Sequence, residues 1–119
     1  MVSREPVLLI VAAEPPELIP LARVLGATER LGPPVRWGRA GRLDGQPVVL
    51  AANGAGRENA ARAVREVCDR WPVRGIVSTG WCGALKPELR IGDIVIADRV
   101  LSLEPVAEFP ANKIGRAHV

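Results

Sequence analysis

An uninterrupted apolar run near the start of the chain limits the folds that it can adopt. Val7–Ala13 reads V-L-L-I-V-A-A, without a polar side chain at any position. Strands with one face in water alternate polar and apolar residues, whereas a continuous aliphatic run is typical of a central strand that is buried on both faces. The 119 residues leave room for one domain. We therefore expect an α/β domain with this strand near the middle of its sheet.

The composition disfavours several functional classes. The net charge of +3 comes from arginines interleaved with acids, and without a basic block we expect no nucleic-acid partner. No apolar run approaches the roughly 20 residues of a membrane span. Cys68, Cys82 and a single histidine are too few for a disulfide framework or a metal-ligand set. We expect no metal, no membrane partner and a reduced, cytoplasmic setting.

Two acids follow the first apolar run. Prolines 15 and 16 are tolerated in the first turn of a helix, so Glu17–Gly26 is predicted to be a helix that ends at its glycine, with residues 27–34 as a loop. This places Glu14 and Glu17 at the carboxyl end of the strand, where α/β proteins bind ligands. Acids at this position also complement a helix dipole, so position alone leaves both roles open.

A hairpin is expected in the middle of the chain. Asp44-Gly45 separates segments 35–43 and 47–53, and this dipeptide between two apolar segments predicts antiparallel neighbours and therefore a mixed sheet. The next segment, Arg57–Trp71, has apolar residues at three- and four-residue spacing and is predicted to be a helix, with Cys68 in the core.

The glycine-rich N-G-A-G segment at 53–56, between that strand and that helix, invites comparison with nucleotide-binding loops. A dinucleotide fingerprint requires a third glycine, but Asn59 stands in its place. A P-loop requires Gly-Lys-Ser/Thr, which is absent. The segment is therefore interpreted as a tight turn into the helix.

A second glycine-rich turn lies in the stretch Val77–Asp98. A buried strand, Gly75–Thr79, is predicted to run into the turn Gly80–Gly83, and a second apolar strand is predicted at Asp93–Ala97. Without a histidine beside it, Cys82 is expected to be a small buried residue rather than a nucleophile. Trp81 either stacks on a base or fills the pocket, and the sequence leaves both open.

Three segments, in the same order, resemble the 5′-methylthioadenosine/S-adenosylhomocysteine nucleosidases of the nucleoside phosphorylase superfamily. Val7–Leu18 is similar to their opening strand and G-A-M-E-E-E-V, and Asn53–Ala61 to their S-G-x-G-K-x-x-A-A. Ser78–Ala97 is similar to their T-G-S-A-G-G-L … G-D-I-V. The resemblance implies the N-terminal half of a three-layer α/β/α domain with a mixed sheet. It also implies hydrolysis of the N-glycosidic bond of a purine nucleoside such as S-adenosylhomocysteine or methylthioadenosine.

The resemblance also assigns roles to residues of this chain. It places the family's water-activating glutamate at Glu17, with Glu14 as the alternative if the register differs. The residues that it implies for substrate binding are Ala13, Gly80, Trp81, Cys82 and Gly83. It implies no cofactor, a nucleoside as the small-molecule substrate, and a homodimer for the full-length protein.

Two departures from the family pattern bear on the reaction. Trp81 replaces a small residue, which reshapes the floor of the pocket. Phosphorylase relatives hold phosphate with an Arg just before the glycine turn and a Ser within it, whereas Ser78 and Trp81 stand at these positions. Hydrolysis is therefore favoured over phosphorolysis. A phosphate-dependent phosphorylase and a non-catalytic nucleoside-binding module are the alternatives.

The end of the sequence has a different character. Lys113–Val119 reads like the in-frame translation of a sequencing-adaptor oligonucleotide, so we expect residues 1–112 to be an incomplete domain and 113–119 a non-native tail. In the family, the glutamate that binds the ribose and the aspartate that protonates the purine lie in the part beyond these residues. The chain by itself is therefore expected to be inactive.

Overall fold

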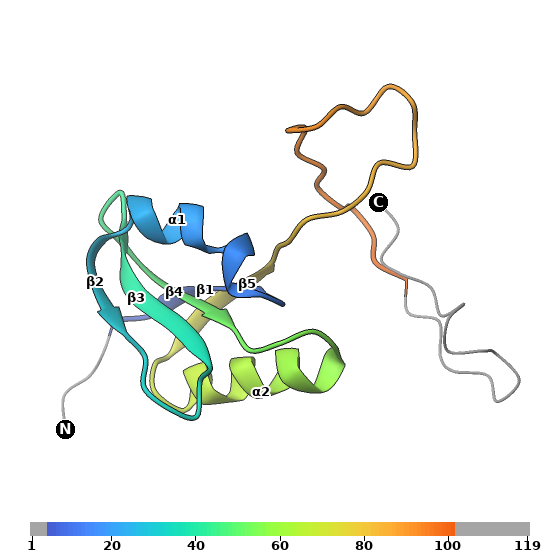
Figure 1. The fold of residues 1–119 in the computed structure, drawn as a ribbon. Coiled ribbons are helices and arrows are strands. Elements are labelled where there is room, and N and C mark those ends of the chain that lie inside the picture. Colours follow the sequence, from blue (N-terminus) through green and yellow to red (C-terminus); the bar gives the residue numbers. More distant parts are fainter. Residues whose placement is uncertain (1–4, 102–119) are drawn as a thin grey trace, which may run out of the picture. The chain divides into compact units, whose positions relative to one another are not determined.

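The computed structural model describes residues 5–101. It divides the chain into two compact units, Met1–Cys82 and Gly83–Val119, which are described separately. All helices and strands of the described residues belong to the first unit (Figure 1). The predicted tail at 113–119 and the predicted domain end at residue 112 lie outside the described residues.

The first unit is built on a mixed five-stranded sheet with the order β2-β3-β4-β1-β5. Strand β1 lies between β4 and β5 and is parallel to both, whereas β3 is antiparallel to β2 and β4. The elements, in chain order, are β1 (Val7–Ala12), the 3-10 turn η1 (Pro15–Glu17), α1 (Ile19–Val24), β2 (Gly26–Arg30), β3 (Trp37–Leu43), β4 (Gln46–Ala52), α2 (Arg57–Cys68) and β5 (Val73–Ser78).

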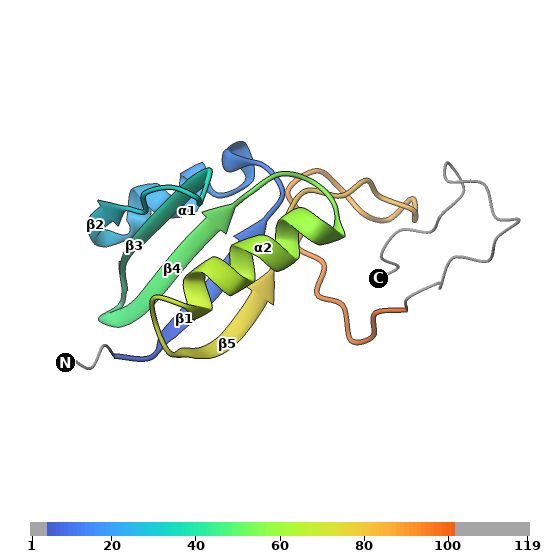
Figure 2. The same ribbon diagram turned by 90° about the horizontal axis from the view of Figure 1, so that it is seen from below.

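Helices cover both faces of this sheet. Figures 1 and 2 show α1 on one face and α2 on the other. Leu9 and Val11 of β1 pack with Val67 of α2, whereas Ile10 points into a second cluster with Leu18, just before α1. Alternate residues of β1 therefore enter different cores, which explains why the whole run is apolar. The predicted three-layer arrangement and mixed sheet are confirmed.

The predicted hairpin is also confirmed. Strands β3 and β4 pair in register from Trp37↔Ala52 to Leu43↔Gln46. The two residues between them, Asp44 and Gly45, have φ angles of 49° and 78°. Positive φ at both central positions is the requirement of the type I′ turn that favours Asp-Gly.

The predicted helix at Glu17–Gly26 and the loop at 27–34 are wrong in their bounds. The α-helix spans only Ile19–Val24, and Gly26–Arg30 is the edge strand β2, paired with β3. Pro20 lacks an amide hydrogen, so it fits the first turn of a helix that begins at residue 19 but not the interior of one that begins at 17. In this edge strand Thr28, Glu29 and Arg30 are exposed, so the sequence G-A-T-E-R carries no apolar pattern that would reveal a strand.

The predicted strand Asp93–Ala97 does not form in the described part of the second unit, residues 83–101, which contains turns but no helix or strand. Ile94 and Ile96 are 88% and 86% exposed. A strand requires a hydrogen-bonded neighbour, and an apolar run alone does not provide one.

Three burial predictions are wrong. Strand β5, predicted to be buried, lies at one edge of the described sheet, with Ile76 and Val77 about half exposed. Cys68 and Cys82 are exposed free cysteines rather than core residues. The buried stripe of α2 is centred on Ala63 and Val67, and Cys68 is rotated out of it by one residue step, about 100°.

Among the described residues, no helix has the length and apolar character needed to cross a lipid bilayer.

Candidate functional site

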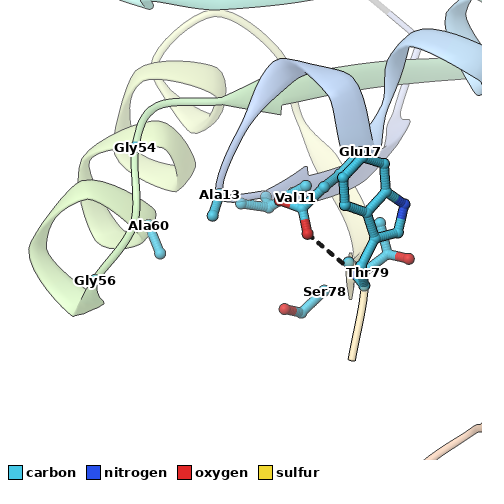
Figure 3. Close-up of a pocket in the computed structure, with 11 residues that line it drawn as sticks. Val11, Ala13, Glu17, Gly54, Gly56, Ala60, Ser78 and Thr79 are labelled. Atoms are coloured by element: carbon cyan, nitrogen blue, oxygen red, sulfur yellow. Dashed lines mark hydrogen bonds between the residues drawn. The ribbon is translucent and has the colours of Figure 1, made fainter. Parts of the chain in front are cut away.

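A pocket of about 270 Å³ lies at the carboxyl ends of the parallel strands in the first unit (Figure 3). Its walls come from the end of β1 and the turn after it, the loop between β4 and α2, the first turns of α2, and the end of β5. The eleven lining residues are Val11, Ala12, Ala13, Glu17, Gly54, Gly56, Ala60, Ser78, Thr79, Gly80 and Trp81.

The parallel pairing of β1 brings these segments together. Val11 is in register with Ser78, and its carbonyl accepts the amide hydrogen of Thr79 at 2.9 Å (Figure 3). On the other side, Gly54 donates its amide hydrogen to the carbonyl of Ala13 at 2.8 Å. The end of β1 is therefore held between the two glycine-containing loops.

Glu17 lies on the 3-10 turn that follows β1, and its carboxylate is held by two backbone amides. Oε1 accepts the amide hydrogen of Glu14 at 2.9 Å, and Oε2 accepts that of Trp81, also at 2.9 Å. The two donors come from segments more than 60 residues apart in the sequence. The structure thus brings together the acid and the glycine turn, which the family resemblance had implied separately as site residues.

These amides affect the ionisation of Glu17. The hydrogen bond from Glu14 lowers the pKa of the carboxyl most and that from Trp81 lowers it further, desolvation partly opposes them, and the nearby backbone of Ala13 adds a small lowering. The net result is a pKa below the ordinary value of 4.5. Glu17 is therefore an anion at neutral pH, and each oxygen keeps acceptor capacity for a water molecule.

The contact between Glu17 and the amide of Trp81 requires glycine at position 80, because the carboxylate occupies the space that a side chain there would need. A Cβ atom built on Gly80 would lie 2.5 Å from Oε2 of Glu17. No real Cβ approaches an oxygen so closely, so any other residue would displace the carboxylate or the end of β5. The glycine expected at this turn from the sequence is thus explained by close packing rather than by an unusual backbone angle.

The opposite wall is shaped by a polar contact that the sequence analysis missed. Asn53 is buried, with 2% of its surface exposed, and its Oδ1 accepts the amide hydrogen of Arg36 at 2.9 Å. The next residue, Gly54, has a φ of 108°, and a Cβ there would lie 2.8 Å from Nη1 of Arg36 and from Nδ2 of Asn59. The N-G-A-G segment is thus a fixed turn, as expected, and it also lines the pocket.

The other predicted site residues have different outcomes. Ala13 and Trp81 line the pocket, and Glu14 contributes its amide hydrogen to Glu17. Cys82 is exposed and is not among the lining residues. Gly83 is the first residue of the second unit. Ser78 and Thr79 were missed as lining residues, although the rule that ligands bind beyond the ends of parallel strands would have included them.

The electrostatic character of the pocket follows from Glu17. It is the only ionisable side chain among the eleven lining residues, none of which is Lys, Arg or His. Within residues 5–101, no group of three or more His, Cys, Asp or Glu side chains is placed to hold a metal ion. The pocket presents one fixed anion, several backbone groups and small side chains.

Comparisons with known proteins place these features in context. A family model described as the phosphorylase superfamily matches residues 6–116. The chain is 45% identical over 92 residues to a 5′-methylthioadenosine/S-adenosylhomocysteine nucleosidase from Mycobacterium bovis, covering 77% of this chain and 36% of that protein. A nucleosidase from Geobacillus thermodenitrificans is 43% identical over 61 residues, which is 51% of this chain and 26% of that protein.

Solved structures give a concordant result. A nucleosidase from Neisseria meningitidis in complex with methylthio-immucillin-A has a TM-score of 0.65 and 25% identity, covering 73% of this chain and 38% of that one. The Colwellia psychrerythraea nucleosidase in complex with adenine has a TM-score of 0.65 and 29% identity, covering 78% of this chain and 38% of that one. The chain thus spans between a quarter and two fifths of the length of these relatives.

Proposed function

Because the chain belongs to the phosphorylase superfamily, we propose that it contributes the water-activating part of a nucleosidase site. The reaction is hydrolysis of the N-glycosidic bond of a purine nucleoside such as 5′-methylthioadenosine or S-adenosylhomocysteine. The observation that carries this proposal is the Glu17 carboxylate, held at the rim of the pocket by the amides of Glu14 and Trp81. The nucleosidase relatives and the ligands named with their structures support the choice of substrate class.

The proposed role of Glu17 is that of a general base. The oxygen of a water molecule bonds to the anomeric carbon while the bond from that carbon to the purine nitrogen breaks. The proton of the water moves to Glu17, and the electron pair of the broken bond remains on the purine, which leaves after taking up a proton. The transition state resembles an oxocarbenium ion, so a nearby carboxylate also stabilises its positive charge.

The lowered pKa of Glu17 fits this role. A carboxylate with a low pKa is a weak base, but an oxocarbenium-like transition state needs little help from the nucleophile. What it needs is a fixed negative charge and an oriented water. The hydrogen bonds from Glu14 and Trp81 keep Glu17 charged and fix the direction of its free acceptor positions.

Water is the nucleophile that this pocket favours. Phosphate carries one to two negative charges at neutral pH, and Glu17 would repel it, while the lining residues include no cation that would attract it. The phosphate-dependent alternative therefore has little support on this side of the site. A non-catalytic binding module stays the other alternative, because the same hydrogen bonds of Glu17 cap the 3-10 turn and join it to the glycine turn.

The remaining assignments extend the proposal. Ala13, Gly80, Trp81, Cys82 and Gly83 are proposed to contact the substrate, and the first three line the pocket. Exposed, unpaired Cys68 and Cys82 favour a reducing compartment such as the cytoplasm. A homodimer is proposed for the longer protein on the family resemblance alone.

A chimaeric enzyme tests the proposed function. The 92 matched residues of this chain would replace their counterparts in the Mycobacterium bovis nucleosidase, and adenine release from methylthioadenosine would be followed by chromatography. We expect Glu17→Gln to lower kcat by about 10²- to 10⁴-fold. Glu14→Gln is the matched control and should keep most of the activity, because residue 14 uses its backbone amide.

Two results of this experiment would contradict the proposal. Full activity of the Glu17→Gln chimaera would show that Glu17 is not the general base. A rate that rises with added phosphate would favour phosphorolysis. The 119-residue chain assayed alone is expected to release no adenine.

A further inference from the structure

Trp81 differs from every other residue around the pocket. The other ten lining residues are glycine, alanine, valine, serine, threonine and the single glutamate, so Trp81 supplies the only aromatic ring. Its side chain is 74% exposed. Apolar residues that follow it, such as Leu85 and Ile94, are also exposed, so what distinguishes Trp81 is that it is a large aromatic residue in the lining of the pocket.

The two other tryptophans have structural roles. Trp37 packs against the core cluster beneath α1, and the guanidinium carbon of Arg39 lies 4.7 Å from the centre of its ring. Trp71 packs against the cluster beneath α2. Trp81 belongs to neither cluster, so packing of the described core does not explain it.

The backbone of Trp81 fixes where its side chain starts. Its amide nitrogen lies 2.9 Å from Oε2 of Glu17, and its Cα is one bond from that nitrogen. If Glu17 activates water at the anomeric carbon, the base attached to that carbon lies within the reach of an indole anchored here. The base is also the only planar aromatic surface of a nucleoside.

We propose that the indole of Trp81 stacks on the purine of the bound nucleoside and is the base-recognising surface of this part of the site. This inference rests on the proposed function, because Glu17 sets the position of the reacting carbon. Stacking between a base and an aromatic side chain is tolerant of substituents, since every base has a π-face. Trp81 therefore selects for a large planar base rather than for one pattern of hydrogen bonds.

Binding measurements on the full 119-residue chain test this inference. The dissociation constant of adenine would be measured by calorimetry for the wild-type chain, Trp81→Ala, Trp81→Phe and the control Trp37→Phe. We expect Trp81→Ala to weaken adenine binding by about 5- to 150-fold, which is the range for loss of one stacked base. Trp81→Phe should recover most of the affinity, and Trp37→Phe should leave it unchanged.

Fluorescence and a ligand without a base add a second measurement. Adenine should quench the tryptophan emission of the wild-type and Trp37→Phe chains but not that of Trp81→Phe. 5-Methylthioribose, which has no aromatic ring, should bind the wild-type chain and Trp81→Ala equally. Circular dichroism of each variant would show that the fold is kept.

The outcomes separate this inference from the proposed function. Equal or tighter binding of adenine to Trp81→Ala would show that the indole only fills the pocket, and would overturn the inference while leaving a nucleoside site in place. If neither adenine nor methylthioadenosine bound the wild-type chain, the inference that Trp81 is the base-recognising surface of this segment would fail, whereas the proposed role of Glu17 is decided by the chimaera.

Discussion

At the scale of single residues, Gly80 tests how closely the two loops depend on each other. An added Cβ would meet Oε2 of Glu17 at 2.5 Å, so Gly80→Ala should push the carboxylate away from the amide of Trp81. Because Oε2 is the far end of a flexible side chain that can move aside, we expect a loss of about 0.5–1.5 kcal/mol in the free energy of unfolding, the contribution of the hydrogen bond from Trp81. Gly32→Ala is the control, because nothing lies within 4 Å of a Cβ there. Equal losses in the two variants, measured by urea denaturation, would contradict the close contact.

The charge of Glu17 gives a second prediction at this scale. Because its pKa is lowered in the folded chain, the folded state binds fewer protons than the unfolded state near pH 4. The stabilisation is therefore complete above the ordinary value of 4.5 and is lost as the pH falls through the folded pKa. The stability difference between the wild-type chain and Glu17→Gln should shrink between pH 6 and about pH 3. A difference that does not change with pH would show that the hydrogen bonds do not favour the charged form.

At the scale of elements, the turn between β4 and α2 separates two effects of glycine. Gly54 and Gly56 both have a positive φ, of 108° and 98°. A Cβ on Gly54 would also collide with Arg36 and Asn59, whereas nothing lies near one on Gly56. Gly56→Ala should cost about 1–3 kcal/mol from backbone strain alone. Gly54→Ala should cost slightly more, because the ends of the Arg36 and Asn59 side chains must move and lose their hydrogen bonds, and denaturant midpoints that reverse this order would contradict the described turn.

The elements that could be predicted from the sequence are those with local signals. The continuous run of β1, the Asp-Gly hairpin and the stripe of α2 each carry their pattern within a dozen residues. Strand β2 has no such signal, because it is held by its pairing with β3. In that pairing, the carbonyl oxygen of Gly26 lies 2.8 Å from the position that a Cβ on Gly41 would take, so only glycine fits there. An edge strand of this kind is determined by its neighbour.

The same distinction applies to the candidate site. The meeting of Glu17 with Gly80 could be predicted, because parallel strands bring their carboxyl ends to one edge and the family resemblance named both segments. The contact of Asn53 with Arg36 could not, because it joins two polar residues 17 positions apart without a recognisable motif. The predicted strand at 93–97 failed for a related reason, since an apolar pattern does not specify a pairing partner.

At the scale of the whole molecule, exposed apolar side chains on β5 predict self-association. Ile76 is 52% exposed on a strand that ends the described sheet, and a strand edge with apolar faces is a template for pairing with another chain. Ile76→Thr keeps a β-branched side chain but removes apolar surface, so it should raise the monomer fraction of the chain at a given concentration. Light scattering after size-exclusion chromatography would measure this.

Val24→Thr is the matched control for this prediction. Val24 is 62% exposed, and it lies on α1 rather than at a strand edge. If exposed apolar area alone drove association, both substitutions would shift the monomer fraction equally. If the strand edge is responsible, because one edge of β5 has no partner strand among residues 5–101, only Ile76→Thr should do so. A chain that stays monomeric at 100 times its lowest measurable concentration would show that β5 does not act as a template.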